Sequence, residues 1–243
     1  MANFTAVTFD MWETVVTDPH DVSVARDADR TARMAAALGM QQDGFRSALD
    51  ALRRHLVKVQ RAEGDLGTPA QLEWLLQAVG APRFRNLTTP RRAELTAAYV
   101  EPLFEHPPLL VPGVDTLLRG LAEADLPVGL ICNTGFTPGS ALRRLLGSLG
   151  VLDYFSALFF SGDVGISKPA VSAFSSTLER LKADASSTVH IGDNPATDVA
   201  GARRAGMHTA LLYRKEGEPD AGHDAHVVVR SMVEFAEYLG IHS

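Results

Sequence analysis

The sequence predicts an α/β fold, a doubly wound parallel sheet with an inserted all-helical segment. A β-prone run at residues 5–9 ends at Asp10, residues 21–104 show helical periodicity without strand-like runs, and beyond Pro107 strand-like runs alternate with helices. Such alternation is typical of βα units, in which helices cover both faces of a parallel sheet. The first strand and the later βα units therefore form one core, and the helical segment interrupts it.

We expect the core domain to comprise residues 1–18 and 106–243, and the helical domain to comprise residues 19–105. Apolar residues recur at helical spacing in the first helix of the insert, at Val24, Ala28, Ala32 and Ala35, and Gly39 fits its end. The second helix, at about residues 43–62, carries one apolar face, formed by Phe45, Leu49, Leu52, Leu56 and Val59. The third and fourth helices start at Thr68-Pro69 and Thr89-Pro90, since proline is favoured in a first turn.

Polar residues follow several strands of the predicted core. The core strands are expected at about residues 5–9, 128–133, 157–161, 188–193, 209–213 and 225–229. The core helices are expected at about residues 114–124, 138–149, 171–182, 198–205 and 232–239. Ligands of parallel sheets bind beyond the carboxyl ends of the strands. Asp10, Asn133 and Asp193 fall at such ends, so we expect them to share one site.

Composition excludes several classes of protein. The chain has 243 residues, of which 46% are hydrophobic and 21% charged, and a formal net charge of -6, which argues against broad nucleic-acid binding. No apolar run reaches the roughly 18 residues of a membrane span. Cys132 is the single cysteine and excludes an intrachain disulfide; together with the absence of a signal-like N-terminus it favours the cytoplasm. We expect a monomer or homodimer whose partner is a small molecule.

Four motifs stand in order along the chain. They are Asp10-Met11-Trp12-Glu13-Thr14, Cys132-Asn133-Thr134, Ser167-Lys168-Pro169, and Gly192-Asp193 with Asp198 beyond it. In this order and spacing the chain resembles the haloacid dehalogenase superfamily over essentially its whole length. The resemblance implies a Rossmann-like core, a C1-type cap in place of the helical domain, and a phosphatase that acts through an aspartyl-phosphate.

The first and third motifs supply candidate catalytic residues. Phosphoryl transfer requires a nucleophile in line with the leaving group and positive charge around the phosphoryl oxygens. Asp10 is the candidate nucleophile, because a carboxylate can divide hydrolysis into two displacements. The resemblance pairs Lys168 with Asp10 and the phosphoryl group, and Thr14 matches the family pattern. The alternatives are a solvated turn aspartate and a solvated loop lysine.

The fourth motif supplies candidate magnesium ligands. Neighbouring carboxylates repel one another unless a cation lies among them, and magnesium prefers oxygen ligands. In the resemblance Asp10 and Asp193 bind the metal, together with the backbone carbonyl of Trp12. Asp198 either ligates through water or orients the other ligands, or else it caps the helix that follows.

The second motif is the candidate phosphate-binding loop. The family usually places Ser or Thr here, so the matching residue is either Cys132, followed by Asn133, or Thr134 after a shift of one position. A hydroxyl and a backbone N–H at this place would bind a phosphoryl oxygen. If Cys132 holds the position, the backbone amides of Asn133 and Thr134 must serve instead.

Trp12 departs from the family pattern, which has a second Asp at this position to protonate the leaving oxygen and then activate water. Three explanations compete: a good leaving group, another proton donor such as Glu13, a cap residue or the substrate, or a different reaction. The alternatives to a phosphatase are a metal-independent 2-haloacid dehalogenase, a phosphonate-cleaving or phosphotransfer enzyme, and a non-catalytic binding protein. Asp193 favours the phosphatase, because dehalogenases of the family lack this carboxylate.

The helical domain holds candidate specificity residues. Arg26, Arg30 and Arg33 share one helix face and are candidates to bind a carboxylate or second phosphate of the substrate. The alternative is a solvated face whose arginines pair with Asp27 and Asp29. Trp74 and Phe84 either line an apolar pocket or pack in the interior.

Overall fold

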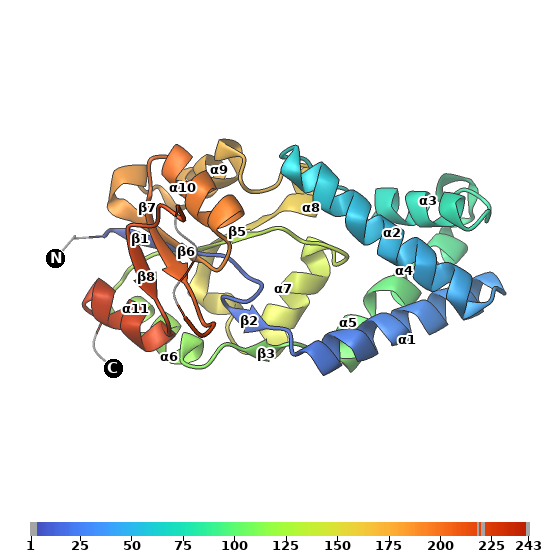
Figure 1. Ribbon diagram of the computed structural model, residues 1–243, viewed down its shortest axis with the longest axis horizontal. Helices are drawn as coiled ribbons and strands as arrows, with labels where there is room; N and C mark the ends of the chain where they lie inside the picture. Colours follow the sequence, from blue (N-terminus) through green and yellow to red (C-terminus); the bar gives the residue numbers. More distant parts are fainter. Residues whose placement is uncertain (1–3, 218, 220–221, 242–243) are drawn as a thin grey trace.

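A six-stranded parallel sheet forms the centre of the molecule (Figure 1). The computed structural model describes residues 4–217, 219 and 222–241. The strands are β1 (Ala6–Phe9), β4 (Val128–Cys132), β5 (Phe155–Phe160), β6 (Thr188–Gly192), β7 (His208–Leu212) and β8 (Val227–Val229). Their order across the sheet is β5-β4-β1-β6-β7-β8, which places β1 between β4 and β6. The predicted strands and their parallel arrangement are thus confirmed.

Helices cover both faces of this sheet, as the doubly wound prediction requires. One face carries α6 (Val114–Glu123), α7 (Gly139–Ser148) and α11 (Met232–Leu239), and the other carries α9 (Val171–Leu181) and α10 (Ala200–Arg204). Alternate residues of one strand serve the two faces: Leu130 packs with α6 and α7, whereas Ile131 packs with α9 and α10. The remaining short elements of the core are α8 (Ser161–Val164), a π-helical turn (Pro195–Val199), and 3-10 turns at Leu152–Tyr154 and Ala185–Ser187.

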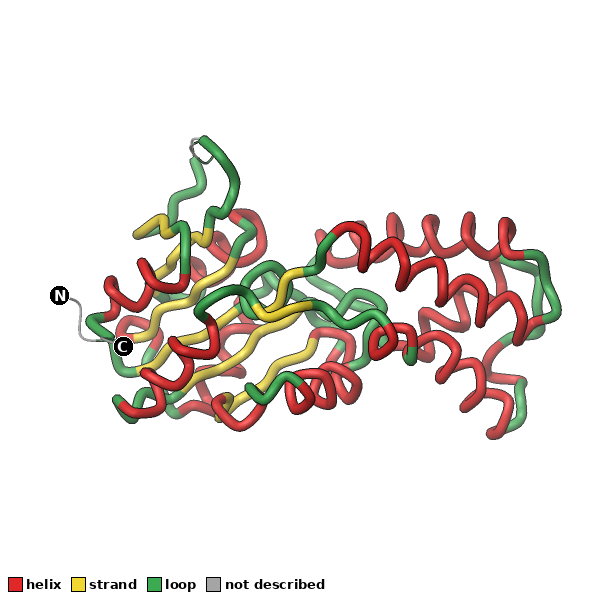
Figure 2. The backbone as a smooth tube through the Cα atoms, turned by 90° about the horizontal axis from the view of Figure 1, so that it is seen from below, coloured by secondary structure: helices red, strands yellow, loops and turns green. Residues whose placement is uncertain are grey.

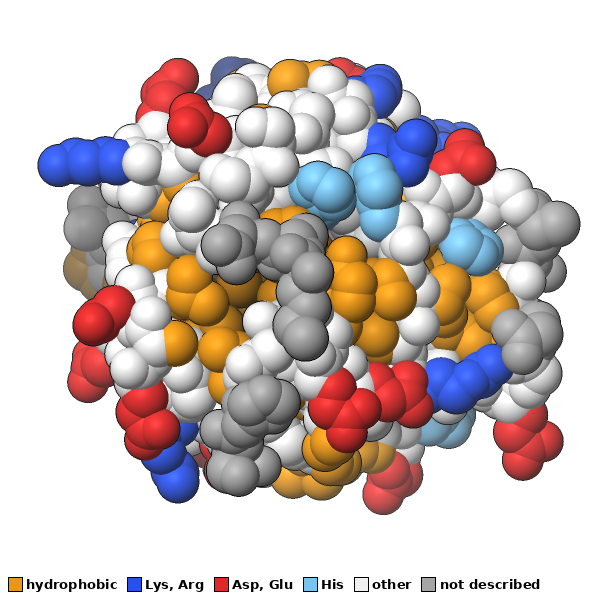
Figure 3. Space-filling model, turned by 90° about the vertical axis from the view of Figure 1, so that its left-hand side faces the viewer, with side chains coloured by type: hydrophobic (Ala, Val, Ile, Leu, Met, Phe, Trp, Pro, Cys, Tyr) orange, Lys and Arg blue, Asp and Glu red, His pale blue; other side chains and the backbone are white. Residues whose placement is uncertain are grey.

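Seen from the end that carries both termini, the core shows apolar side chains at its centre and charged ones around its rim (Figure 3). This end is opposite the helical segment, which lies beyond the carboxyl edge of the sheet (Figures 1 and 2). The candidate carboxylates gather at the edge of the sheet that faces the helical segment.

The helical segment runs from His20 to Glu105. Its helices are α1 (His20–Leu38), α2 (Gln42–Arg61), α3 (Thr68–Ala78), α4 (Thr89–Val100) and α5 (Pro102–Glu105), with a 3-10 turn at Phe84–Asn86. Gly39 ends α1 with a φ of 64°, a left-handed conformation that glycine adopts without strain. The predicted apolar face of α2 is buried at Phe45, Leu49, Leu52 and Leu56. In the described part of the chain, no helix has the length and apolarity needed to cross a bilayer.

The apolar stripe predicted for α1 is only partly buried. Ala35 is buried, but Val24 is 51% exposed, and the buried residues of the helix also include Arg26, Arg30 and Met34. Helical spacing identifies the most apolar stripe, but alanines contribute little apolar area, and both arginines have partners in distant parts of the chain. The helix therefore turns its arginine-bearing face inward.

The two linkers that join the helical segment to the core pair with each other. β2 (Val16–Thr17) and β3 (Leu109–Leu110) form a two-stranded antiparallel ribbon that strand patterning did not predict, because each strand has only two residues. Beside the ribbon, Arg26 donates from Nη1 and Nη2 to the carboxylate of Asp18 at 2.7 and 2.8 Å. Its Nε and Nη2 also donate to the carbonyl of His106, at 2.8 and 2.6 Å. One buried side chain thereby joins both linkers.

Candidate active site

Asp10 lies directly after the central strand β1. Its backbone N–H donates to the carbonyl of Ile191 on the neighbouring strand at 2.9 Å, which fixes the residue at the edge of the sheet. The side chain is 6% exposed and forms an ion pair with Lys168. Thr14 Oγ1 lies 3.4 Å from the other carboxylate oxygen. Thr14 itself is fully enclosed, and its hydroxyl contacts Asp10.

Lys168 lies between two carboxylates. The side chain is 1% exposed, which overturns the alternative of a solvated loop lysine, and Nζ lies 2.7 Å from Asp198 Oδ1 as well as pairing with Asp10. The backbone of Lys168 is held by the side chain of Asn133, which accepts from Lys168 N at 2.8 Å and donates to its carbonyl at 3.0 Å. Asn133 therefore positions the lysine from the loop that follows β4.

Three carboxylates gather around this lysine. Oxygens of Asp10, Asp193 and Asp198 all lie within 4.8 Å of one another. Burial raises the pKa of Asp10 to about 7, against the opposing charge of Lys168, and burial with repulsion from Asp198 raises the pKa of Asp193 to about 6. Burial acts to raise the pKa of Asp198 too, but the charge of Lys168 outweighs it and holds that pKa below its usual range. One lysine cannot compensate two buried carboxylates and a third, partly exposed one beside them.

This residue set fits a divalent cation. Carboxylate oxygens are the ligands that magnesium prefers, and the ion commonly keeps several waters, so a partly exposed Asp193 beside two buried carboxylates suits it. A cation would favour the charged forms of Asp10 and Asp193, both of which burial now disfavours. Asp10, Asp193 and Asp198 are the side chains available to hold it.

Asp198 does not cap the helix that follows it, which overturns that alternative. Asn194 caps the π-helical turn instead, where its Oδ1 accepts from Ala196 N at 2.9 Å and Thr197 N at 3.3 Å. Asp198 is buried and accepts from Asn194 N at 3.0 Å. Gly192 makes room for it, because a Cβ at that position would collide with the Asp198 carboxylate.

A buried histidine behind Asp198 was missed in the sequence. His190 lies within β6, with Nδ1 2.9 Å from Thr8 Oγ1 and Nε2 3.6 Å from Asp198 Oδ1. Burial lowers the pKa of His190, which favours its neutral form. The sequence does not reveal that His190 lies beside Asp198, because a histidine within a buried strand cannot be distinguished from an ordinary core residue.

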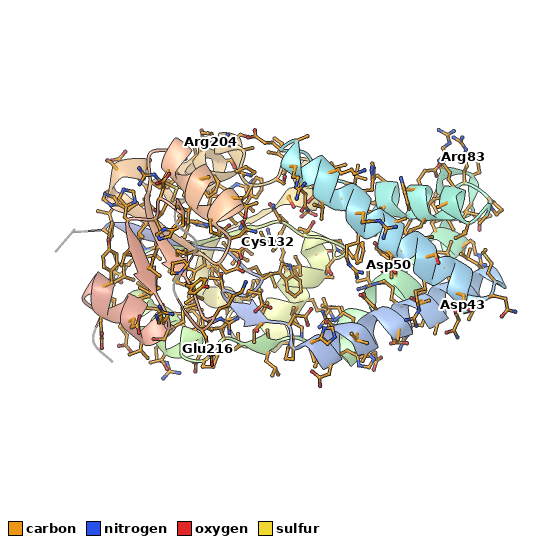
Figure 4. All side chains as sticks on the ribbon, viewed as in Figure 1. Asp43, Asp50, Arg83, Cys132, Arg204 and Glu216 are labelled. Atoms are coloured by element: carbon orange, nitrogen blue, oxygen red, sulfur yellow. The ribbon has the colours of Figure 1, made fainter. Side chains whose placement is uncertain are left out.

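The second motif separates into two parts. Cys132 is fully enclosed at the end of β4 (Figure 4), and burial raises the pKa of its thiol well above the usual value. Asn133 and Thr134 line a cavity instead. Thr134 donates from its backbone N to Ser161 Oγ at 2.9 Å, and its hydroxyl accepts from Gly162 N at 3.2 Å.

Ser161 connects this loop to the helical segment and was also missed. Its hydroxyl donates to the buried carboxylate of Asp65, whose pKa burial raises. The same stretch contacts the core through its backbone: Asp65 N donates to Gly165 O at 3.1 Å, and Ser167 N donates to Glu63 O at 3.1 Å. Two polar residues separated by 96 positions share no local pattern, so the contact appears only in the fold.

The cavity has a volume of about 490 Å³ and lies between the core and the helical segment. Its core wall is formed by Trp12, Asn133, Thr134, Gly135, Phe136 and Thr137. Its other wall is formed by Asp18, His20, Ser23, Val24, Arg26, Asp27, Arg30, Arg53 and Gln60. Trp74 and Phe84 are not among the lining residues; Trp74 stacks on His55 at 5.6 Å and Phe84 is buried.

Glu13 is held away from this cavity. Its carboxylate accepts from Thr17 Oγ1 at 2.9 Å, Asp18 N at 2.9 Å and Arg214 Nη2 at 2.6 Å. Glu13 lines a separate cavity of about 470 Å³ together with Asp193. Its acceptors are thus occupied by neighbours, which argues against Glu13 as the substitute proton donor beside Trp12.

Comparison with known proteins gives matches over most of the chain. Residues 4–206 match the model of a hydrolase family described as haloacid dehalogenase-like hydrolase. A phosphoserine phosphatase of Thermus thermophilus is 31% identical over 69% of this chain, which spans 63% of that relative's length. A ribulose-1,5-bisphosphate 5-phosphatase of Halopiger xanaduensis is 30% identical over 91% of this chain and 89% of its own length.

A solved structure shares the fold. The crystal structure of a 2-haloacid dehalogenase from Pseudomonas syringae superposes with a TM-score of 0.72 at 23% identity, covering 98% of each chain. The same architecture therefore occurs in a protein with a dehalogenase name, whereas the two sequence relatives above carry phosphatase names, and the reaction must be inferred from the site.

Proposed function

We propose that this chain, which belongs to the haloacid dehalogenase-like hydrolases, is a magnesium-dependent phosphatase that acts on a small phosphorylated molecule through a phosphorylated Asp10. The observation that carries the proposal is the cluster of Asp10, Lys168, Asp193 and Asp198 at the carboxyl edge of the sheet, in which Asp193 alone is partly exposed. A nucleophile, a fixed cation and a place for a divalent cation are the components that phosphoryl transfer requires.

In the proposed reaction, a carboxylate oxygen of Asp10 attacks phosphorus while the bond to the ester oxygen breaks. Water then attacks the same phosphorus, releases inorganic phosphate and restores the carboxylate. Lys168 favours the ionised form of Asp10 and provides positive charge beside it. Asn133 holds the backbone of Lys168, and Thr134 lines the adjoining cavity.

Magnesium would be held by Asp10, Asp193 and the backbone carbonyl of Trp12, with Asp198 as a ligand through water or as the residue that orients the others. When bound, the ion supplies positive charge that stabilises the phosphoryl oxygens. Asp198 is already fixed by Lys168 and Asn194, so it can orient its neighbours without changing its own position.

Trp12 defines the kind of ester that we propose as substrate. The indole lines the cavity and can neither protonate a leaving oxygen nor activate water. General acid–base help is worth roughly 10²–10⁴-fold. We therefore propose a substrate whose leaving group departs with little protonation, such as an acyl phosphate or an activated ester.

A 2-haloacid dehalogenase is the second candidate. Trp12 favours it, because a halide leaving group needs no proton. The cluster of three carboxylates argues against a dehalogenase, because a metal-independent reaction does not require it. The two relatives described above carry the names of phosphatases for phosphoserine and a sugar bisphosphate, which supports the phosphatase.

Turnover of 4-nitrophenyl phosphate and of a 2-haloacid, each with chelator and with magnesium, tests the proposal. We expect hydrolysis of the phosphate ester only with magnesium, and its loss in Asp10→Asn while the circular dichroism spectrum is unchanged. Halide release in chelator would favour the dehalogenase. Absence of turnover over a panel of phosphate esters, acyl phosphates and haloacids would favour a non-catalytic binding protein.

A further inference from the structure

We infer that Arg30 and Arg53 form a subsite for a second anionic group of the substrate, either a carboxylate or another phosphate group. The inference rests on the proposed function for the phosphate half of the molecule. It concerns the opposite wall of the same cavity, which the helical segment provides.

The two arginines meet at one residue of the core. Arg30 comes from α1 and Arg53 from α2, and their guanidinium carbons lie 5.3 and 5.1 Å from the centre of the Phe136 ring. Phe136 is two residues beyond Thr134 in the loop that follows β4. The pair therefore lies beside the loop on which we place the phosphoryl group, and both arginines line the same cavity.

The donors of Arg30 are only partly used. Its Nε donates to the carbonyl of Tyr99 at 2.8 Å, and its Nη1 donates to Asp27 at 2.6 Å. Nη2 has no acceptor among the residues that the structure describes. Arg30 is one of the residues that line the cavity, so this unused donor belongs to the cavity wall.

The charges of the cavity wall leave an excess of cations. Asp27 is shared, because it pairs with both Arg30 and Arg53. Arg26 is fully engaged by Asp18 and the carbonyl of His106, so it serves the linkers and not a ligand. Among the lining residues, three guanidinium groups thus face two carboxylates.

One further carboxylate approaches from outside the cavity. Asp50 accepts from Arg53 at 3.1 Å, but its side chain is 51% exposed on α2 (Figure 4), where water screens the pair. Arg30 is only 2% exposed, and a buried cation with incomplete compensation favours a bound anion. The geometry thus separates Arg30 and Arg53 from Arg33, the third arginine of the α1 face, which pairs with Asp29 and Glu105.

The test compares binding of non-hydrolysable ligands to the unmodified protein in magnesium by calorimetry. Alkylphosphonates of two to five carbons are matched with phosphonates of the same chain length that end in a carboxylate or a second phosphonate. A charge-assisted hydrogen bond implies a preference of about tenfold or more for at least one doubly charged compound. The preference should disappear in Arg53→Gln, which is half exposed and expected to fold. It should persist in Arg33→Gln, a control arginine on α1 that does not line the cavity.

Equal affinity for singly and doubly charged ligands would overturn the subsite, as would a preference that Arg53→Gln retains. Failure of every phosphonate to bind would overturn it as well. The turnover assay of the proposed function is independent of this result: an enzyme that hydrolyses 4-nitrophenyl phosphate but shows no such preference would retain the proposed function and lose the subsite.

Discussion

Removal of the buried lysine is the perturbation whose result the structure specifies best. In Lys168→Met a chain of similar length replaces the one cation among Asp10 and Asp198, which are 6% and 1% exposed. Removing one partner of a buried pair costs about 3–5 kcal/mol, because the remaining charge is uncompensated. We expect a loss of that order in the free energy of unfolding at pH 8 in chelator.

The loss should depend on pH in a defined direction. Without Lys168, burial leaves the folded-state pKa values of both carboxyls above their unfolded values. Such a carboxyl destabilises the fold once the pH exceeds its unfolded pKa, and the cost grows until the pH passes its folded pKa. Because the pKa of Asp10 is already raised to about 7 with the lysine present, the deficit should be largest at pH 8 and smaller at pH 5.5.

Urea unfolding followed by circular dichroism, at both pH values and with chelator or magnesium, measures this deficit. Magnesium should reduce it by restoring a cation to the cluster. Lys58→Met, an exposed position on α2, is the matched control and should change the free energy of unfolding little. If Lys168→Met lost the same free energy of unfolding at pH 8 and pH 5.5, or none at either pH, the reasoning that Lys168 balances buried carboxylates would be refuted.

Three further predictions concern the same site. Gly192→Ala should displace the Asp198 carboxylate and raise the magnesium concentration that gives half-maximal rate by about tenfold. Gly147→Ala, where a Cβ meets its nearest atom at 3.7 Å, should leave that concentration unchanged. At low magnesium, activity should fall as the pH drops through about 7, because Asp10 takes up a proton, and added magnesium should move this fall to lower pH; unchanged pH–rate profiles would contradict it. For aryl phosphates the rate should rise steeply with the acidity of the leaving phenol, and Trp12→Asp should flatten that slope at saturating substrate; a shallow slope in the unmodified enzyme would indicate another acid.

The sequence predicted the features that local pattern and topology determine. Strand alternation identified the sheet, and the carboxyl-end rule predicted that Asp10, Asn133 and Asp193 lie at one edge of it. These predictions succeed because each depends on neighbouring residues, on a motif, or on a general property of parallel sheets.

The errors and omissions depend on contacts between distant residues. Arg26 and Arg30 are buried because their acceptors lie 80 and 69 positions further along the chain, which helical spacing cannot register. By local criteria Asp198 suited a helix cap as well as a metal site, and its contacts with Lys168 and the backbone N–H of Asn194 exclude the cap. No local sequence pattern marks Ser161 as a site residue, because its partner Asp65 lies in the helical segment, far away in the sequence.

The joining of both linkers by the β2–β3 ribbon and Arg26 determines how the two halves of the molecule can separate. The ribbon and the arginine connect the linkers to each other, so the linkers must rotate together as a single hinge. On the other side of the cavity, the backbone contacts of Glu63 and Asp65 with the core act as a latch. Rotation about the linkers that widens the entrance would require the contacts of Glu63 and Asp65 with the core to break, whereas the ribbon and the contacts of Arg26 could stay intact.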